Sequence, residues 1–228
     1  MKKLLYSMIL LALMLSMNHK AFAEETLPVL NKAVIDIETE DGQYVVTEQI
    51  EISNIQGESL EVGHLLSKIT DNQVSEVSFN TTEGDVSPSI ETGERLDKYF
   101  LSLNNVEQGS VAYTIEYKIP RVDHHFDVPL FVPDFATSDV ERNIVISFTA
   151  PEGMEIQKNS FPNIIEGGKN HVEKHMTNIP SKVAYVFSEE TVYLHSYNII
   201  SFIAIFALLV LLVSWGLVEI KKSKRRNS

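Results

Sequence analysis

The chain has 228 residues, of which 44% are hydrophobic and 22% charged, and it contains no cysteine. This apolar content is too high for a disordered acidic tail, and the absence of cysteine excludes a disulfide scaffold, a thiol nucleophile and a Cys-ligated metal. The formal net charge of −12 argues against a nucleic-acid partner, because binding to nucleic acid requires a basic surface. We therefore expect a folded protein that binds no nucleic acid.

The N-terminal residues have the pattern of a secretory signal peptide. Two lysines precede an apolar run at residues 4–17, and residues 21–23, Ala-Phe-Ala, form a small-x-small cleavage site. As a helix the run is about 21 Å long, which is shorter than a hydrocarbon core of ~30 Å. We expect residues 1–23 to be removed, so that the mature chain begins at Glu24.

The period-two alternation of apolar residues predicts strands in the region that follows. The clearest examples are residues 111–119 and 44–52, the second of which follows Asp41-Gly42, a favoured hairpin dipeptide. Further strands are expected at residues 35–37, 60–69, 74–79, 96–103, 144–148 and 183–187. Seven or eight short strands without helical periodicity predict an all-β fold, an antiparallel immunoglobulin-like sandwich formed by one domain.

The segment from residue 120 to residue 139 differs from these strands. Its three prolines exclude a regular central strand, yet it contains three phenylalanines and two adjacent histidines. The aromatic rings either pack into the edge of the sandwich or form an exposed surface that docks a partner. We expect a partner-binding surface that consists of Phe126, Phe131, Phe135, His124 and His125.

Three side chains form a candidate metal site, which we keep as an alternative. His171, Glu173 and His175 point to one side of a strand, and in a helix the two histidines would lie one turn apart. Either geometry can present two imidazoles to one zinc or copper ion. The glutamate does not occupy the position that a zinc hydrolase requires for its general base.

The C-terminal residues have the pattern of a membrane anchor. Residues 199–218 form an apolar run whose polar members are two serines, and as a helix they span ~30 Å, a full hydrocarbon core. The tail at 219–228 holds five Lys and Arg residues, which places it in the cytoplasm by the positive-inside rule. One crossing then places the folded domain, residues 24–188, outside the membrane on a stalk at 189–198.

The charge is distributed unevenly between these regions. Residues 24–197 contain 30 acidic and 11 basic side chains, whereas the tail is basic. A strongly acidic surface keeps a domain soluble, repels other polyanions and attracts cations or basic partners in a salt-dependent way.

The motifs of common enzymes are missing from the sequence. It has no Gly-x-Ser-x-Gly elbow and no phosphate-binding Gly-Lys-Ser/Thr loop, so we expect neither an enzyme nor a cofactor. We expect a single-pass cell-surface protein that sits in the lipid bilayer of the cell membrane and binds another membrane or envelope protein close to it. The alternatives are a metal-binding or metal-sensing ectodomain and, third, a hydrolase that acts on envelope polymers.

Overall fold

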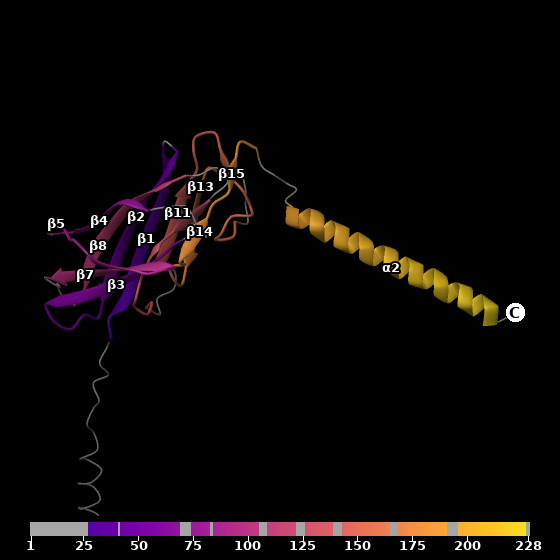
Figure 1. The fold of residues 1–228 in the computed structure, drawn as a ribbon, viewed down its shortest axis with the longest axis horizontal. Helices are drawn as coiled ribbons and strands as arrows, with labels where there is room; N and C mark the ends of the chain where they lie inside the picture. The colour runs from indigo at the N-terminus through magenta and orange to yellow at the C-terminus, as the bar shows by residue number, and fades with distance from the viewer. Residues whose placement is uncertain are drawn as a thin grey trace, which may run out of the picture.

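The protein consists mainly of β-strands, followed by one C-terminal helix (Figure 1). The structure is a computed structural model, and it describes residues 27–40, 42–68, 74–82, 84–104, 109–121, 126–138, 143–164, 168–190 and 196–226. The predicted signal peptide and the two adjacent histidines at 124 and 125 lie outside these residues. The predicted domain boundaries stay predictions.

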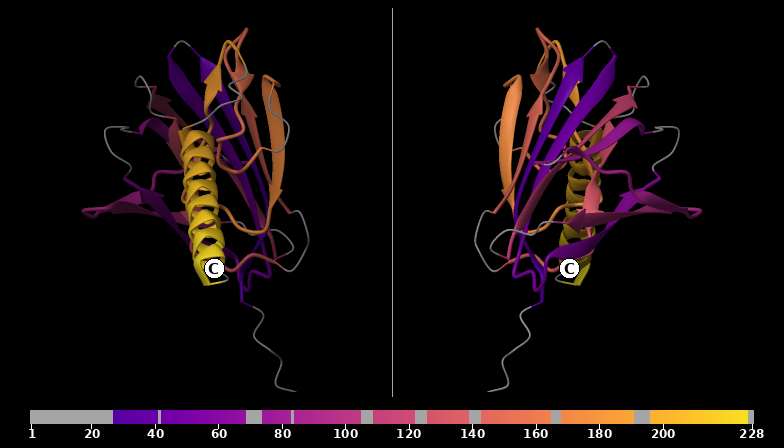
Figure 2. Two further views of the ribbon diagram at one scale, coloured as in Figure 1. Left: turned by 90° about the vertical axis from the view of Figure 1, so that its right-hand side faces the viewer. Right: turned by 90° about the vertical axis from the view of Figure 1, so that its left-hand side faces the viewer.

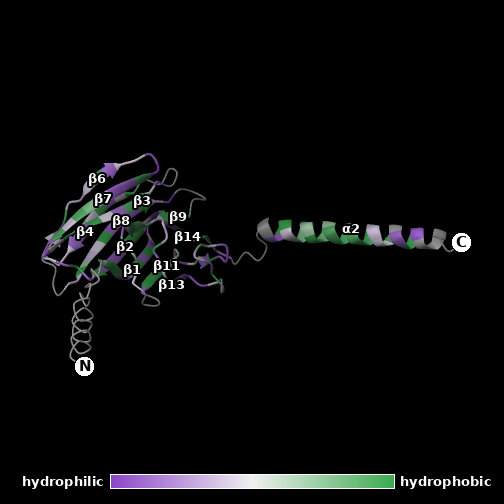
Figure 3. Cartoon of the chain, turned by 90° about the horizontal axis from the view of Figure 1, so that it is seen from below, coloured by the Kyte–Doolittle hydropathy of each residue, from purple (hydrophilic) through white to green (hydrophobic). Residues whose placement is uncertain are grey.

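The larger sheet has seven strands. In spatial order they are β13 (His171–Met176), β11 (Ile144–Thr149), β1 (Val29–Glu40), β2 (Gln43–Ser53), β8 (Val111–Pro120), β4 (Ser75–Thr81) and β5 (Gly84–Asp85). Figure 3 shows the strands from β4 to β13 side by side in this order. The long strands follow the predicted alternation, because every second side chain of β2 is buried.

The prediction of a wholly antiparallel fold was wrong for one pair of strands. β1 and β11 run parallel, with Ala33 beside Ile144 and Glu38 beside Thr149, so the larger sheet is mixed. The other side of β1 pairs antiparallel with β2 through a tight hairpin. Gly42 has a φ of 80° in that hairpin, a backbone conformation that glycine adopts without strain.

A second layer of strands covers the inner face of this sheet. It contains a four-stranded sheet and two short ribbons: β10 (Phe131–Pro133), β3 (Ser59–Ser67), β7 (Leu96–Asn104) and β6 (Ser89–Thr92); β14 (Lys182–Ala184) with β9 (Asp127–Pro129); and β12 (Glu155–Ile156) with β15 (Phe187–Ser188). The strands of the smaller sheet cross those of the larger one at a steep angle (Figure 2). The two layers form a β-sandwich.

Aromatic side chains fill the space between the layers. Phe131 lies among the rings of Phe79, Tyr99 and Tyr117, with ring centroids 5.0 to 5.6 Å apart in T-shaped contacts. Under the short ribbons, Tyr185 and Phe187 stack on the ring of Phe148 of β11, with ring centroids 4.3 and 5.8 Å away. These contacts explain why a chain without cysteine holds its two layers together.

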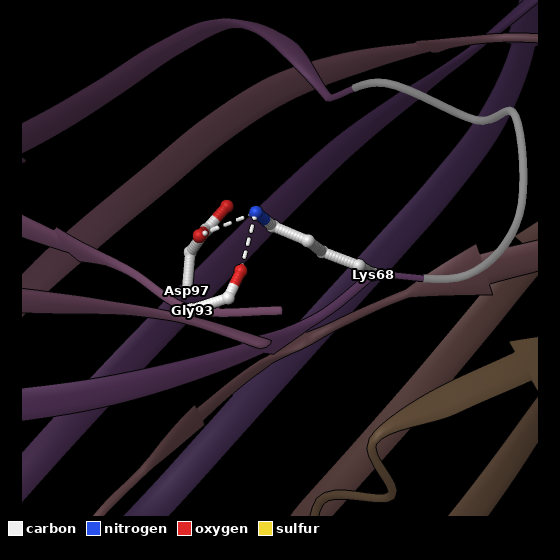
Figure 4. Close-up of polar contacts among 3 residues, drawn as sticks. All are labelled: Lys68, Gly93 and Asp97. Atoms are coloured by element: carbon white, nitrogen blue, oxygen red, sulfur yellow. Dashed lines mark hydrogen bonds and ion pairs between the residues drawn. The ribbon is translucent and has the colours of Figure 1, made fainter. Parts of the chain in front are cut away.

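A lysine ties one corner of the smaller sheet together (Figure 4). Lys68 Nζ lies 3.0 Å from Asp97 Oδ1 and donates a hydrogen bond of 2.8 Å to the carbonyl oxygen of Gly93. The backbone of Lys68 also bonds to Arg95, so the end of β3 is joined to the β6–β7 hairpin.

The helix, α2 (Ser196–Arg226), is long and apolar enough to cross a membrane between Asn198 and Lys222. Among the residues that the structure describes, none covers the apolar part of this segment, and the C-terminal end of the helix is hydrophilic (Figure 3). An apolar helix exposed over this length is unfavourable in water, and its length matches the hydrocarbon core of a bilayer.

Several strands differ from those predicted. β13 was considered as either a strand or a helix, and β9 and β10 were predicted to be an irregular loop. The two latter strands are short and end at Pro129 and Pro133, which lie where a missing N–H costs no interior ladder bond.

Candidate functional site

The outer face of the larger sheet carries polar rows that run across several strands. The register places Val34 of β1 beside Gln49 of β2, Gln49 beside Thr114 of β8, and Thr114 beside Asn80 of β4. These side chains point away from the core because the buried residues occupy the alternate positions.

A groove of about 370 Å³ runs over these four strands, and we call it the outer-face groove. Its floor is the row just described, and a second row, with Lys32, Glu51 and Ala112 in register, closes one end. The volume lies within the range of small-ligand sites, and hydroxyl, amide, ammonium and carboxylate groups line it together with apolar side chains such as Val34 and Ala112. Such a surface can bind a ligand by hydrogen bonds and by apolar contact.

A β-bulge shapes the end of the outer-face groove. The register of β1 against β2 shifts between Leu30 and Lys32, which leaves Asn31 as the extra residue. Asn31 Nδ2 donates to Glu51 Oε1 at 2.7 Å, and the Asn31 carbonyl oxygen accepts a bond of 3.1 Å from Asn143. These contacts orient the Glu51 carboxylate.

Acidic side chains continue along the same face beyond the groove. Asp36, Thr47 and Glu116 form the next row, in which the hydroxyl of Ser147 donates to Asp36 Oδ1. This face therefore disfavours an anionic ligand.

The predicted aromatic surface does not form as expected. Phe131 is fully buried in the core, and so it is not available to a partner. Phe126 and Phe135 are half-buried against the same core, and the ring of Phe126 lies 5.4 Å from that of Phe187. The phenylalanines point inward because the two layers leave an apolar space there, which corresponds to the packing alternative considered from the sequence.

The predicted metal ligands lie on the edge strand β13. His171, Glu173 and His175 are exposed on one side of it, as the strand geometry required. His175 Nε2 lies 3.2 Å from Glu173 Oε1, whereas His171 Nδ1 is 3.0 Å from the hydroxyl of Thr149. At ~3.3 Å per residue the two histidines are about 13 Å apart along the strand. Among the described residues, no group of three or more His, Cys, Asp or Glu side chains is placed to hold a metal ion.

A carboxyl group and an imidazole are buried between the layers. Glu48 Oε1 accepts a hydrogen bond of 2.9 Å from the backbone N–H of Phe131 and lies 2.6 Å from the hydroxyl of Tyr117. Burial raises the pKa of Glu48 to about 8, although both hydrogen bonds act in the opposite direction.

The imidazole belongs to His64, on the facing layer. Its Nε2 lies 2.8 Å from the hydroxyl of Tyr113, and burial lowers the pKa of His64 to about 3, partly opposed by the backbone carbonyl of Val62. His64 is therefore neutral at physiological pH. Both Glu48 and His64 are completely buried, so they act on the fold rather than on a ligand.

The sequence contained signals for these residues. Glu48 and His64 fall at inward positions of alternating strands, where a polar residue interrupts an apolar series. Ala112 and Thr114 fall at outward positions of a predicted strand, but their neighbours across the groove depend on register, which alternation alone does not determine.

Comparisons with known proteins identify no family. No protein-family model matches the chain, and no curated protein sequence matches it. Among solved structures, similar ones include a Legionella pneumophila protein for which nutrient binding has been proposed, with a TM-score of 0.44 and 9% identity over 70% of this chain and 66% of that chain. Another is yeast LTA4 hydrolase, with a TM-score of 0.40 and 13% identity over 74% of this chain and 31% of that chain. The chain thus spans less than two thirds of either protein, and likenesses this weak imply no shared function.

Proposed function

We propose that this chain is a single-pass membrane protein whose acidic β-sandwich lies outside the membrane and binds another membrane or envelope protein, without enzymatic chemistry. The observation that carries the proposal is α2, an apolar helix that none of the other described segments buries. β15 ends at Ser188 and α2 begins at Ser196, so the sandwich is held close to the bilayer surface.

The outer-face groove is the binding surface that we assign to the sandwich. It replaces the aromatic surface expected from the sequence, because Phe131 is buried. Its hydroxyl and amide groups suit a partner that presents backbone or polar side chains, and the acidic surroundings favour a neutral or basic one.

Two finer expectations belong to the same proposal. One is the removal of residues 1–23, which mass spectrometry of the mature chain tests by finding Glu24 at the N-terminus. The other is an immunoglobulin-like arrangement of the strands, for which the order of strands in both layers is the test.

Labelling with a membrane-impermeant maleimide tests the anchor and its orientation. Because the chain has no cysteine, single substitutions Ser102→Cys in the sandwich and Ser223→Cys in the tail give unambiguous signals. We expect Ser102→Cys to react on intact cells and Ser223→Cys to react only after the membrane is permeabilised. Labelling of both sites on intact cells, or of neither, contradicts the proposed topology.

Site-specific photo-crosslinking in the native membrane tests the groove. A photoreactive residue at position 114, on the groove floor, should form an adduct with a partner, and one at position 102, on the exposed side of β7, should not. Gln49→Ala combined with Glu51→Lys should reduce the adduct at position 114 at least tenfold at unchanged expression. Equal adducts at both positions, or an adduct that survives the groove variant, would show that another surface binds.

A further inference from the structure

Glu48, on the larger sheet, accepts a hydrogen bond from a proline-containing segment of the second layer, residues 127–133. The segment 127–133 contains β9, which pairs with β14 of one ribbon, and β10, which pairs with β3 of the smaller sheet, so it joins two pieces of the second layer. Two bonds fix its backbone from the opposite layer: Phe131 N–H donates to Glu48 Oε1 at 2.9 Å, and the Pro129 carbonyl oxygen lies 2.8 Å from the Tyr117 hydroxyl.

The number of hydrogens available in this cluster favours a protonated Glu48. The Tyr117 oxygen lies within hydrogen-bond distance of two acceptors, Glu48 Oε1 and the Pro129 carbonyl. A phenol has one hydrogen to donate, and a proline carbonyl has none. If Tyr117 donates to both acceptors, they share its one hydrogen; each contact has a hydrogen of its own when Glu48 is protonated and donates to the Tyr117 oxygen while Tyr117 donates to Pro129.

Within the part of the chain that the structure describes, the surroundings of Glu48 provide no charge that would stabilise a carboxylate. Its cross-strand neighbours are Ile35 on β1 and Ile115 on β8, and its Oε2 has no hydrogen-bond partner among the described residues. Tyr113 and Tyr117 face it from β8, and burial raises the pKa of both phenols well above the ordinary value. On the facing layer, the titratable group that contacts Tyr113 is His64, which is neutral.

We infer that protonation of Glu48 controls whether segment 127–133 is closed, and we call this arrangement the latch. The neutral acid keeps the segment closed on the core, and loss of the proton favours opening. After deprotonation, Tyr117 has one hydrogen for two acceptors, and the carboxylate is left buried without a cation beside it among the described residues. Opening the segment admits water to the carboxylate and removes this cost.

The direction of the pH effect follows from linkage. Glu48 has a pKa of about 8 when the segment is closed and its ordinary value, about 4.5, when it is open to water. Since the closed state binds the proton more tightly, closure is complete at low pH and is weakened as the pH rises between these two values. The equilibrium constant for opening should rise about tenfold for each pH unit in this interval.

Hydrogen exchange on the full-length protein in lipid nanodiscs measures this opening. The protection factor of the Phe131 amide, which corrects for intrinsic exchange, should fall about 100-fold between pH 5.5 and 7.5. In Glu48→Gln the side chain is neutral at every pH, so we expect protection lower than in the wild type at pH 5.5 but constant over the range. Glu116→Gln, a substitution at an exposed position of β8, is the matched control and should keep the wild-type slope.

A second measurement needs no variant. The 13C shift of the Glu48 side-chain carboxyl in the wild-type chain reports its protonation directly, and we expect a midpoint near 8. A midpoint near 4.5 would overturn the inference, as would a Phe131 amide whose protection stays constant while Glu48 titrates. Neither result bears on the outer-face groove, so the latch and the proposed function fail independently.

Discussion

Glu48 and Glu51 lie three residues apart on the same strand, and they experience opposite environments. Glu48 points into the core, where its carboxyl is fully buried and bonded to the backbone of another layer. Glu51 points to the outer face, where it lies at the end of the groove and accepts a bond from Asn31. Identical side chains on β2 therefore perform a structural role on one face and are accessible to a ligand on the other.

This difference shows where a binding function can lie in a sheet of this kind. Glu48 and His64 are buried between apolar layers. Burial raises the pKa of Glu48 and lowers the pKa of His64, so both side chains favour the neutral form. The outer face keeps its charges in water, so its rows of polar side chains can exchange water for a ligand. The core aromatic residues, which resembled a contact surface in the sequence, stabilise the sandwich.

Of the substitutions that compare the core with the outer face, removal of a core ring should lower the free energy of unfolding most. Phe131→Ala deletes a buried ring at the centre of four ring contacts, so we expect a loss of about 3–5 kcal/mol in the free energy of unfolding. Phe135→Ala, at a half-buried position of the same segment, should cost less than half as much. Denaturant unfolding of the full chain in detergent measures both, and equal losses would contradict the burial of Phe131.

The two glutamates of β2 allow a direct test of the two faces. Glu48→Ala leaves the Phe131 amide buried without an acceptor, which should cost about 2–3 kcal/mol of stability at pH 6. Glu51→Ala removes one hydrogen bond at a partly exposed site and should cost about 0.5–1 kcal/mol. If the order of the two losses were reversed in unfolding curves, Glu48 would not anchor the second layer.

The smallest effect is expected at the corner drawn in Figure 4. Lys68→Met keeps the alkyl chain but removes the ion pair with Asp97, which is partly exposed and should contribute about 0.2–1 kcal/mol. Thermal unfolding at low and high salt measures the difference between wild type and variant, which should shrink as salt screens the pair. A difference that grows with salt would mean that the lysine acts through packing instead.

The alternating strands and the helix were predictable because their signals are local. Residues 44–52 and 111–119 correspond to β2 and β8, whose inward side chains belong to the hydrophobic core. The run at 199–218 lies within α2. The inward position of Glu48 was also visible, although its partners were not, since they come from β8 and from the segment 127–133.

The missed features depend on residues that are distant in the sequence. β13 is a strand because it pairs antiparallel with β11. β11 also pairs in parallel with β1, although β1 and β11 lie far apart along the chain. Whether the three phenylalanines near residue 130 face inward could not be decided from spacing, because three prolines remove the alternation that reveals the buried face. Tertiary packing decided it.

Local patterns of apolar and charged residues were enough to establish a strand-rich acidic region followed by an apolar helix with a basic end, since these properties depend on neighbouring residues alone. Three-dimensional contacts decided which side chains share the outer-face groove, which aromatic rings are buried and that Glu48 is surrounded by apolar layers. Each of these depends on register and on burial, and both are created only when distant strands pair.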